Sequence, residues 1–406
     1  MRDRSGRRAR WFPAVVIVVL LAFLAAGTAN NLVRHPQPRL VADGAPARTG
    51  VLEATSSPGA GGEQYGDLIQ HAISDLDRLT LPNGATVAGW DGPWRYVWPR
   101  DASFVAAARC ALGQYDEADR VLSFLDGVRP PTGRWEARYT ETGALVRDGR
   151  QPQLDGSGWV LWATWFCRAG GRYWELVRES AEQIVAELTP DGLPGPSSDY
   201  WERPEAELTL GTVAPLLTGL RSAVAIATEQ GRQDQAARWR TALDKLSTAT
   251  DRTFGPDYPR TPAQAETFLE PGLETIGVGG GADAIVTVLG PPFAPAREVV
   301  STAIDRAHAV LTQPNGGVTP GEDWRADGVS WTPQTALFAL SAAARGDRAT
   351  AQSLLSWLDR HRTVTGALPE KVNRDEEPAG EAPLSWTAAL VVLAGTALQR
   401  PLPIPG

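Results

Sequence analysis

The sequence predicts an all-α protein: an (α/α)6 barrel of six inner and six outer helices, preceded by one N-terminal membrane-anchor or signal helix. From about Glu63 onward apolar residues recur with a helical period, strand signals are scarce, and two kinds of helical run alternate. One kind is amphipathic and charged, and the other is apolar on nearly every face, which is typical of a buried helix. A repeat of about 50 residues indicates two concentric rings, with an irregular all-α bundle as the alternative.

The helical runs can be placed in order along the chain. The charged amphipathic runs, which we expect outside, lie at about 64–79, 115–127, 173–188, 233–250, 294–312 and 348–362. The nearly apolar runs, which we expect inside, lie at about 101–112, 155–168, 206–229, 278–288, 331–345 and 384–398. The run at 278–288 also fits a short strand, because it combines β-branched residues with glycines. Together the runs define one domain, residues 63–406.

Composition and charge exclude several classes of protein. The 406-residue chain has a net charge of −8, and without residues 1–29, which hold five arginines and one aspartate, the net charge is −12. Such a surface repels phosphate backbones, so we expect no nucleic-acid partner. Four scattered histidines give little material for a metal site, and we expect neither a metal nor another cofactor. The 15 tryptophans favour a ligand that stacks on aromatic rings. We expect the protein to be a monomer.

The N-terminus is typical of a targeting element rather than of a folded domain. Residues 1–29 combine a basic end with the apolar run from Trp11 to Ala26, which is marginally long enough to span a bilayer. Gly27 and Ala29 also suit a signal-peptidase site, so either an uncleaved anchor or a cleaved signal is compatible. In both cases the basic end stays in the cytoplasm and the rest is exported. Residues 30–62, rich in Pro, Gly, Ala and Ser, are interpreted as a flexible linker.

The two cysteines can pair in an exported chain. Cys110 and Cys167 each precede a glycine by three residues, near the end of a predicted inner helix. If those helices are neighbours, we expect the two Cα atoms to lie less than about 7 Å apart. Two buried free thiols are the alternative.

Polar and aromatic clusters precede the inner helices. In a toroid all inner helices run parallel, so the loops that enter them lie at one end of the barrel. The five loops therefore predict one common mouth. Such a mouth suits a sugar, because aromatic rings cover the apolar faces of a pyranose and charged groups bind its hydroxyls. The clusters are WDGPWRYVWPRD, GRQPQLDGSGW, SSDYWERPEAE, GEDWRADGVSW and GALPEKVNRDEEPAGEAPLSW.

Two glutamates at this mouth suit glycosidic bond cleavage, which needs a carboxylic acid and a second carboxylate on different loops. Glu202 lies in DYWERPE before the third inner helix, and Glu370 lies in LPEKV before the sixth. Taken singly, either glutamate is more typical of a solvated loop residue than of a catalytic one. The aromatic neighbours and the common mouth favour the catalytic interpretation of both. The sequence has no GxSxG elbow, and GVGGGAD is not followed by the lysine of a phosphate-binding loop.

The motifs YVWPRD, PQLDGSG, DYWE, and LPE followed by PLSW resemble the glucoamylase family, family 15 of the glycoside hydrolases. The resemblance covers about residues 64–400, the catalytic barrel of bacterial members. It implies an (α/α)6 barrel that inverts the anomeric centre, with Glu202 as general acid and Glu370 as the base that activates water. The substrate-binding residues it implies are Trp98, Arg100, Asp101, Gln153, Asp155, Trp201, Glu322, Trp331 and Trp386.

The chain departs from the family pattern at three places. Arg203 follows the general-acid position, where fungal relatives have a second acidic residue. Thr319 stands where the family often places an arginine that contacts the second sugar. A tryptophan expected shortly before PQLDG is missing, and Arg147, Asp148 and Arg150 stand nearby instead.

These observations predict an exported inverting glycoside hydrolase that releases glucose from the non-reducing end of an α-glucoside or α-glucan. A non-catalytic carbohydrate-binding or regulatory paralogue with the same pocket is the alternative. Glu202 and Glu370 enter from the third and sixth inner helices, which lie opposite each other in a ring, so we expect a wide separation and inversion. A general acid must hold a proton, so we expect Glu202 to be the more buried of the two, despite the charge of Arg203.

Overall fold

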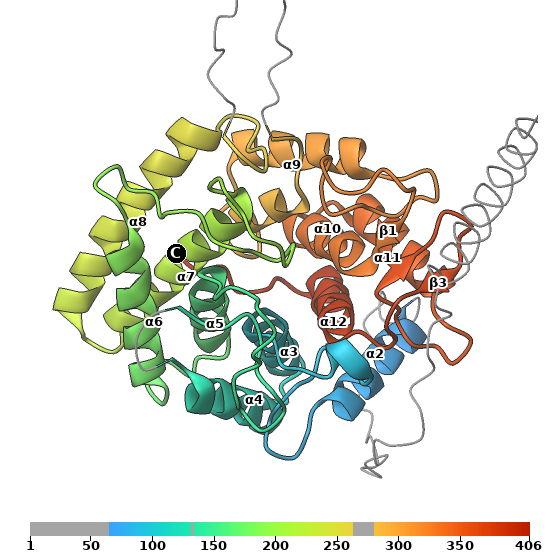
Figure 1. Cartoon of the computed structure of the whole chain (residues 1–406), viewed down its shortest axis with the longest axis horizontal. Helices are drawn as coiled ribbons and strands as arrows, with labels where there is room; N and C mark the ends of the chain where they lie inside the picture. Colours follow the sequence, from blue (N-terminus) through green and yellow to red (C-terminus); the bar gives the residue numbers. More distant parts are fainter. Residues whose placement is uncertain (1–64, 131–133, 263–279) are drawn as a thin grey trace, which may run out of the picture.

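The computed structural model describes residues 65–130, 134–262 and 280–406, which form a ring of helices in two concentric layers (Figure 1). The outer helices are α2 (Gly66–Leu79), α4 (Tyr115–Val128), α6 (Trp174–Glu187), α8 (Gln233–Phe254), α9 (Glu298–Leu311) and α11 (Arg348–Arg360). The inner layer contains α3 (Pro99–Ala111), α5 (Asp155–Phe166), α7 (Leu210–Glu229), η2 (Ala284–Leu289), α10 (Thr332–Arg345) and α12 (Ser385–Gln399). The ring closes through α3, α5, α7, η2, α10 and α12 in turn.

The pattern of burial explains why the two layers form. Every residue of α3 is buried, and α5, α7, α10 and α12 are buried along almost their whole length. The outer helices each bury one apolar stripe and expose a charged face, as the sequence predicted. Residues 1–29 and 30–62, for which the sequence predicts a targeting element and a linker, lie outside the described residues.

The fourth inner position differs from the helix expected at 278–288. The described part of this segment becomes helical only at Ala284, as the short 3-10 helix η2. Gly280 and Gly281 disfavour a helix before it, and the Asp283 carboxylate accepts a hydrogen bond from the Ile285 backbone N–H. The Gly290-Pro291-Pro292 sequence then ends the helix within six residues.

Glycines allow two inner helices to approach closely. A Cβ atom on Gly158 of α5 would lie 2.1 Å from the carbonyl oxygen of Pro215 on α7, and one on Gly219 would lie 2.6 Å from the Cα of Gly158. Within the described ranges, α7 is the one helix long and apolar enough to cross a membrane, yet 89% of its most apolar 18-residue window is buried inside the ring. It is therefore a core helix of the barrel.

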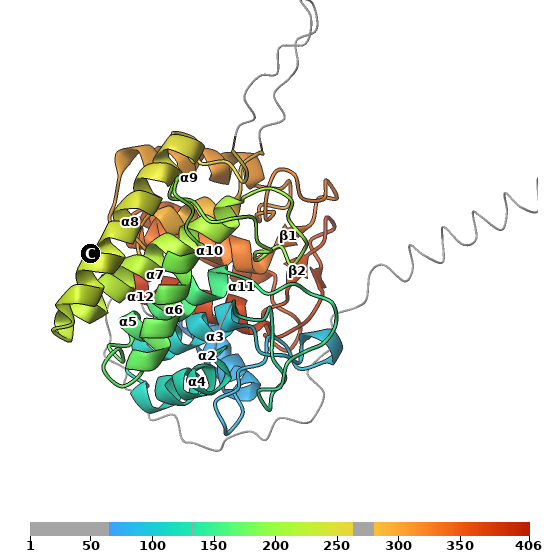
Figure 2. The same cartoon turned by 60° about the vertical axis from the view of Figure 1, so that its left-hand side comes forward.

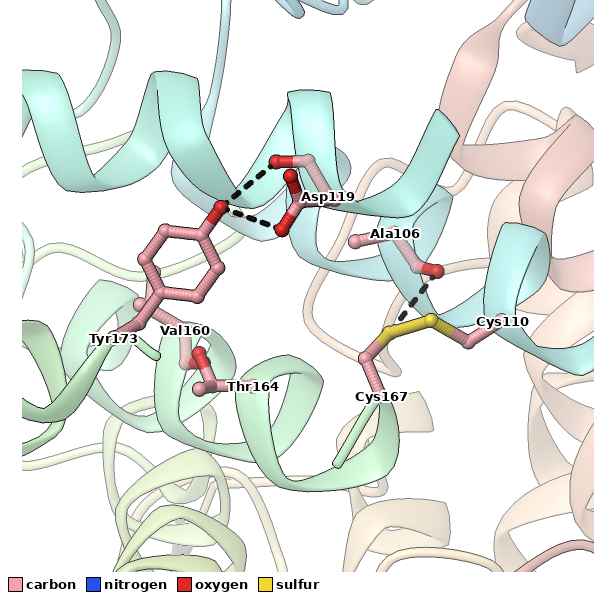
Figure 3. Close-up of a disulfide and its surroundings, with 7 residues drawn as sticks. All are labelled: Ala106, Cys110, Asp119, Val160, Thr164, Cys167 and Tyr173. Atoms are coloured by element: carbon pink, nitrogen blue, oxygen red, sulfur yellow. Dashed lines mark hydrogen bonds between the residues drawn. A yellow bond between two sulfur atoms is a disulfide. The ribbon is translucent and has the colours of Figure 1, made fainter. Parts of the chain in front are cut away.

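The cysteines join the first two inner helices. Cys110 on α3 and Cys167 at the end of α5 form a disulfide with Cα atoms 5.4 Å apart, within the distance that the sequence predicted (Figure 3). The Cys167 sulfur lies 3.4 Å from the Ala106 carbonyl oxygen, which is a contact because a disulfide sulfur has no proton to donate. The bridge closes a sequence separation of 57 residues at the end of the barrel opposite the helix entries.

Replacing both cysteines by alanine should lower the free energy of unfolding by about 2–4 kcal/mol, because the unfolded chain loses a long closed loop. Urea denaturation of the double variant and of the parent protein measures the difference. Thiol titration of the denatured, unreduced parent is the control, and two titratable thiols would contradict the bridge.

Candidate active site

A cavity of about 260 Å³ lies at the end of the ring where the chain enters the inner helices. Figure 2 shows the connections into these helices gathered on one side of the molecule, together with the short strands β1 (Ser330–Trp331) and β2 (Lys371–Val372). The cavity is lined by Ala88, Pro93, Trp94, Trp98, Arg100, Asp101, Arg138, Arg150, Tyr200, Trp201, Glu202, Pro320, Trp324, Trp331, Pro333, Gln334, Glu370, Leu384 and Trp386. All five predicted loops contribute to it.

Arg100 and Asp101 begin α3 at the base of this cavity. The Arg100 Nε donates to Asp101 Oδ2 at 3.0 Å, and its guanidinium lies 4.3 Å from the centre of the Trp386 ring. Burial raises the pKa of the Asp101 carboxyl, although the Arg100 guanidinium acts in the opposite direction. Below them the barrel is filled by rings, since Phe104 packs on Trp386 with centroids 6.0 Å apart. The cavity is therefore closed at its inner end.

Glu202 projects into the cavity from a tight turn. Its φ of 58° is in the left-handed region, and its backbone N–H donates to the Asp199 carbonyl at 2.8 Å. The Asp199 carboxylate also accepts the Trp201 N–H at 2.9 Å, which fixes the turn. The two carboxylate oxygens of Glu202 each face a guanidinium: Oε1 lies 3.3 Å from Arg100 Nη1 and Oε2 lies 2.5 Å from Arg150 Nη1.

Buried Arg260 supports this turn from behind. Its guanidinium contacts the carboxylates of Asp199 at 2.9 Å, Asp283 at 2.9 Å and Glu205 at 2.6 Å, and it lies 3.5 Å from the centre of the Trp201 ring. Burial opposes its charge, but these carboxylates raise the pKa of Arg260 above its ordinary value. The ion pairs tie the turn that carries Glu202 to the start of η2.

Glu370 is held on the opposite loop by backbone pairing. Its N–H donates to the Glu381 carbonyl at 2.7 Å, its carbonyl accepts the Thr332 N–H at 3.1 Å, and β1 pairs with β2 immediately beside it. The Trp94 indole N–H donates to Glu370 Oε1 at 3.3 Å. Oε2 lies 3.2 Å from the Lys371 ammonium. Both oxygens of this carboxylate therefore lie beside donors.

The cavity brings together most of the residues selected from the sequence. Glu202 and Glu370 both line it, and so do Trp98, Arg100, Asp101, Trp201, Trp331 and Trp386. Among the described residues, no group of three or more His, Cys, Asp or Glu side chains is arranged to hold a metal ion.

Three expected binding residues do not line the cavity. Gln153 is buried and donates to the Asp199 carbonyl at 3.3 Å, and Asp155 is buried beneath the wall, where it accepts from the Trp159 indole at 3.3 Å. Glu322 is exposed and accepts a hydrogen bond from the Ala282 backbone at 3.0 Å. Their side chains form hydrogen bonds with neighbouring backbone and ring groups, so these three residues support the loops rather than face the cavity.

The expectation that Glu202 is the more buried glutamate is wrong. Its side chain is 19% exposed and that of Glu370 is 11% exposed. The left-handed turn carries Glu202 into open space, whereas strand pairing encloses Glu370. Arg203, expected to act on Glu202, instead pairs with Glu205 at 2.9 Å and lies over the Trp201 ring.

Sequence reasoning missed several lining residues. Trp94 and Trp324 lie inside the clusters that were singled out, so their residue type was an available signal. Arg150 lies within a cluster but was interpreted only as a departure from the family pattern. Arg138 has no local signal, because the irregular segment that carries it precedes the second cluster and reaches the cavity only through the fold.

Comparison with known proteins places this fold. No protein-family model matches the chain. Over 171 residues, 40% of the chain, it is 23% identical to an uncharacterized glycosyl hydrolase of Methanocaldococcus jannaschii. The match spans about a quarter (26%) of that protein's length.

Solved structures of glycosidases and glucoamylases share the architecture, as the motifs predicted. A wild-type glycosidase superposes with a TM-score of 0.67 at 20% identity, covering 82% of this chain and 98% of its own. A bacterial glucoamylase complexed with acarbose superposes with a TM-score of 0.64 at 18% identity, covering 83% of this chain and 56% of its own. The glucoamylase of Saccharomycopsis fibuligera superposes with a TM-score of 0.64 at 12% identity, covering 82% of this chain and 94% of its own. The chain therefore has the α/α barrel fold of these enzymes.

Asp155 generates a prediction about stability and pH. Burial raises its pKa to about 7, with Asp199 and Glu202 adding to the effect and Arg100 opposing it. Between the ordinary pKa of 3.8 and about 7, the unfolded carboxyl is ionised while the folded one keeps its proton. The parent protein should therefore lose stability relative to Asp155→Asn as pH rises from 4 to 7, by at most about 1.4 kcal/mol per pH unit, with no further change above 7.

Chemical denaturation of both proteins between pH 4 and 8 measures this difference. Asp244→Asn, at an exposed position on α8, is the matched control. Parallel stability profiles for the parent and Asp155→Asn would show that Asp155 is ionised in the fold.

Proposed function

We propose that this protein is an inverting glycoside hydrolase that releases glucose from the non-reducing end of an α-glucoside or α-glucan. The observation that carries the proposal is the pair Glu202 and Glu370, which come from the third and sixth inner connections and line one cavity of aromatic and charged side chains. A cavity closed at its inner end accepts a chain terminus rather than the middle of a polymer.

The side chains around the cavity suggest the role of each residue. Trp98 and Trp386 offer ring faces to a pyranose, and the Arg100–Asp101 pair binds hydroxyls of the terminal glucose by charge-assisted hydrogen bonds. Glu202 protonates the leaving oxygen, and Glu370 activates the attacking water. The Trp94 indole and the Lys371 ammonium orient the Glu370 carboxylate.

Relatives in fold support the choice of substrate. One glycosidase of this fold has been solved in complex with glucose, and a bacterial glucoamylase has been solved with acarbose. Maltose, isomaltose, trehalose, dextrin and dextran form the panel that identifies the linkage, because loop positions rather than the two glutamates set that preference.

Proton NMR during the first minutes of a digest tests the mechanism. We expect β-glucose to appear first, before mutarotation, and Glu202→Gln and Glu370→Gln each to lower kcat by roughly 10²–10⁴-fold. Circular dichroism checks that both variants stay folded. Initial release of the α-anomer would contradict the assignment of roles.

A carbohydrate-binding paralogue without turnover is the second candidate. It is favoured by one observation, the two guanidiniums that already occupy both oxygens of Glu202. Tryptophan fluorescence separates the two functions, because glucose or maltose would quench it in either case. Quenching without hydrolysis of any sugar in the panel identifies the paralogue.

We further propose that the protein acts as a monomer outside the cytoplasm, anchored by residues 1–29 or released if that segment is cleaved. The Cys110–Cys167 bridge supports an oxidising compartment. Fractionation of cells that express the full chain with a C-terminal tag tests this. We expect tagged protein that is digested by protease added to intact spheroplasts, and complete protection would contradict export.

A further inference from the structure

Arg150 occupies the side of the cavity where the leaving group must lie, if Glu202 is the general acid of the proposed function. Its Nη1 lies 2.5 Å from Glu202 Oε2, the oxygen that Arg100 does not contact. Its side chain is 34% exposed, whereas that of Arg100 is 9% exposed. Arg150 is therefore the more accessible of the two cations that contact this carboxylate.

The contacts of Glu202 require Arg150 to move during turnover. A carboxyl that protonates a leaving oxygen must direct an O–H group toward it, and a guanidinium offers only donors. With Arg100 on one oxygen and Arg150 on the other, both oxygens of Glu202 face donors. Arg100 is buried and tied to Asp101, so Arg150 is the group that can release Glu202 if another acceptor is supplied.

A second arginine is fixed beside Arg150. Arg138 is buried, donates to the Pro93 carbonyl at 2.7 Å, pairs with Asp148, and lies 5.0 Å from the centre of the Trp98 ring. Its Nε has no hydrogen-bond partner. Burial acts to raise the pKa of Asp148, but the hydrogen bonds from Arg138 and from the Arg150 backbone hold this pKa below its ordinary value. Asp148 thus remains an anion that keeps both guanidiniums at one wall.

The charges that line the cavity also favour an anion. The charged groups in and beside the lining are four cations, Arg100, Arg138, Arg150 and Lys371, and four carboxyl groups, those of Asp101, Asp148, Glu202 and Glu370. When Glu202 holds the proton that acid catalysis requires, this set has one surplus positive charge, which a neutral sugar does not balance. A negative charge on the substrate balances it where solvent is largely excluded, so the interaction is strong.

We propose that the leaving-group side of the cavity binds an anionic substituent through Arg150, with Arg138 beside it. The preferred substrates are then α-glucosides whose aglycone or second sugar carries a carboxylate or a sulfate. The substituent draws Arg150 away from Glu202, which leaves that carboxyl free to hold and deliver its proton. This inference rests on the proposed glycosidase function.

A cycle of two substrates and two proteins tests it. The substrates are 4-carboxyphenyl α-glucoside and its neutral methyl ester, and the proteins are the parent and Arg150→Gln. Differences in leaving-group reactivity cancel when the carboxylate-to-ester ratio of kcat/KM is compared between proteins. We expect this ratio to fall about ten- to hundredfold in Arg150→Gln, the range of a charge-assisted hydrogen bond.

The matched control is Arg203→Gln, which removes a nearby arginine that pairs with Glu205 and does not line the cavity. It should leave the ratio unchanged. An equal ratio in the parent and Arg150→Gln overturns the inference while the proposed hydrolysis stands.

If the parent hydrolyses neither compound, the glycosidase proposal fails for these substrates, and the same ratio is taken from Kd values measured by tryptophan fluorescence. Tighter binding of the carboxylate that depends on Arg150 then supports the anionic subsite, and equal affinities reject it.

Discussion

The inner helices are apolar on nearly every face, and this constraint decides where chemistry can occur. A buried helix offers no place for an unpaired polar side chain, so the polar groups gather on the loops that enter the helices. Because those helices run parallel around the ring, their entries share one end of the barrel. Arg100 and Asp101 lie at the first such entry, and Glu370 lies on the last connection. The site is thus a consequence of how the core is packed.

Arg260 shows how a loop becomes rigid enough to hold Glu202 in the cavity. A left-handed residue such as Glu202 is strained unless its surroundings hold it. Arg260 supplies this support by binding Asp199, Asp283 and Glu205 at once, in a buried position where removal of the cation would leave uncompensated carboxylates. The same guanidinium packs on the Trp201 ring, so a single charge fixes both the turn and one wall of the cavity.

The helical layers were predictable because periodicity is a local property, and the observed helices agree with it except at η2, where glycines and a following Gly-Pro-Pro sequence compete with helix formation. The position of the two glutamates in one cavity was predictable because aromatic residues adjoin them in the sequence clusters. Burial was not predictable: Asp155 lies behind the wall, Glu202 is more open than Glu370, and Arg138 arrives from a segment without any motif. Each depends on how distant loops pack together, which no local pattern records.

Contacts between cations and aromatic rings recur on the walls of the cavity, so the same side chains determine its charge and its shape. Guanidiniums lie over Trp98, Trp201 and Trp386, and the Lys371 ammonium lies over Trp331. Such contacts hold large rings in place, and they keep the cations close to carboxylates that would otherwise be costly to bury. A wall of this kind has little freedom to rearrange. The exposed end of Arg150 is the exception, so substrate-dependent changes at this mouth should begin there.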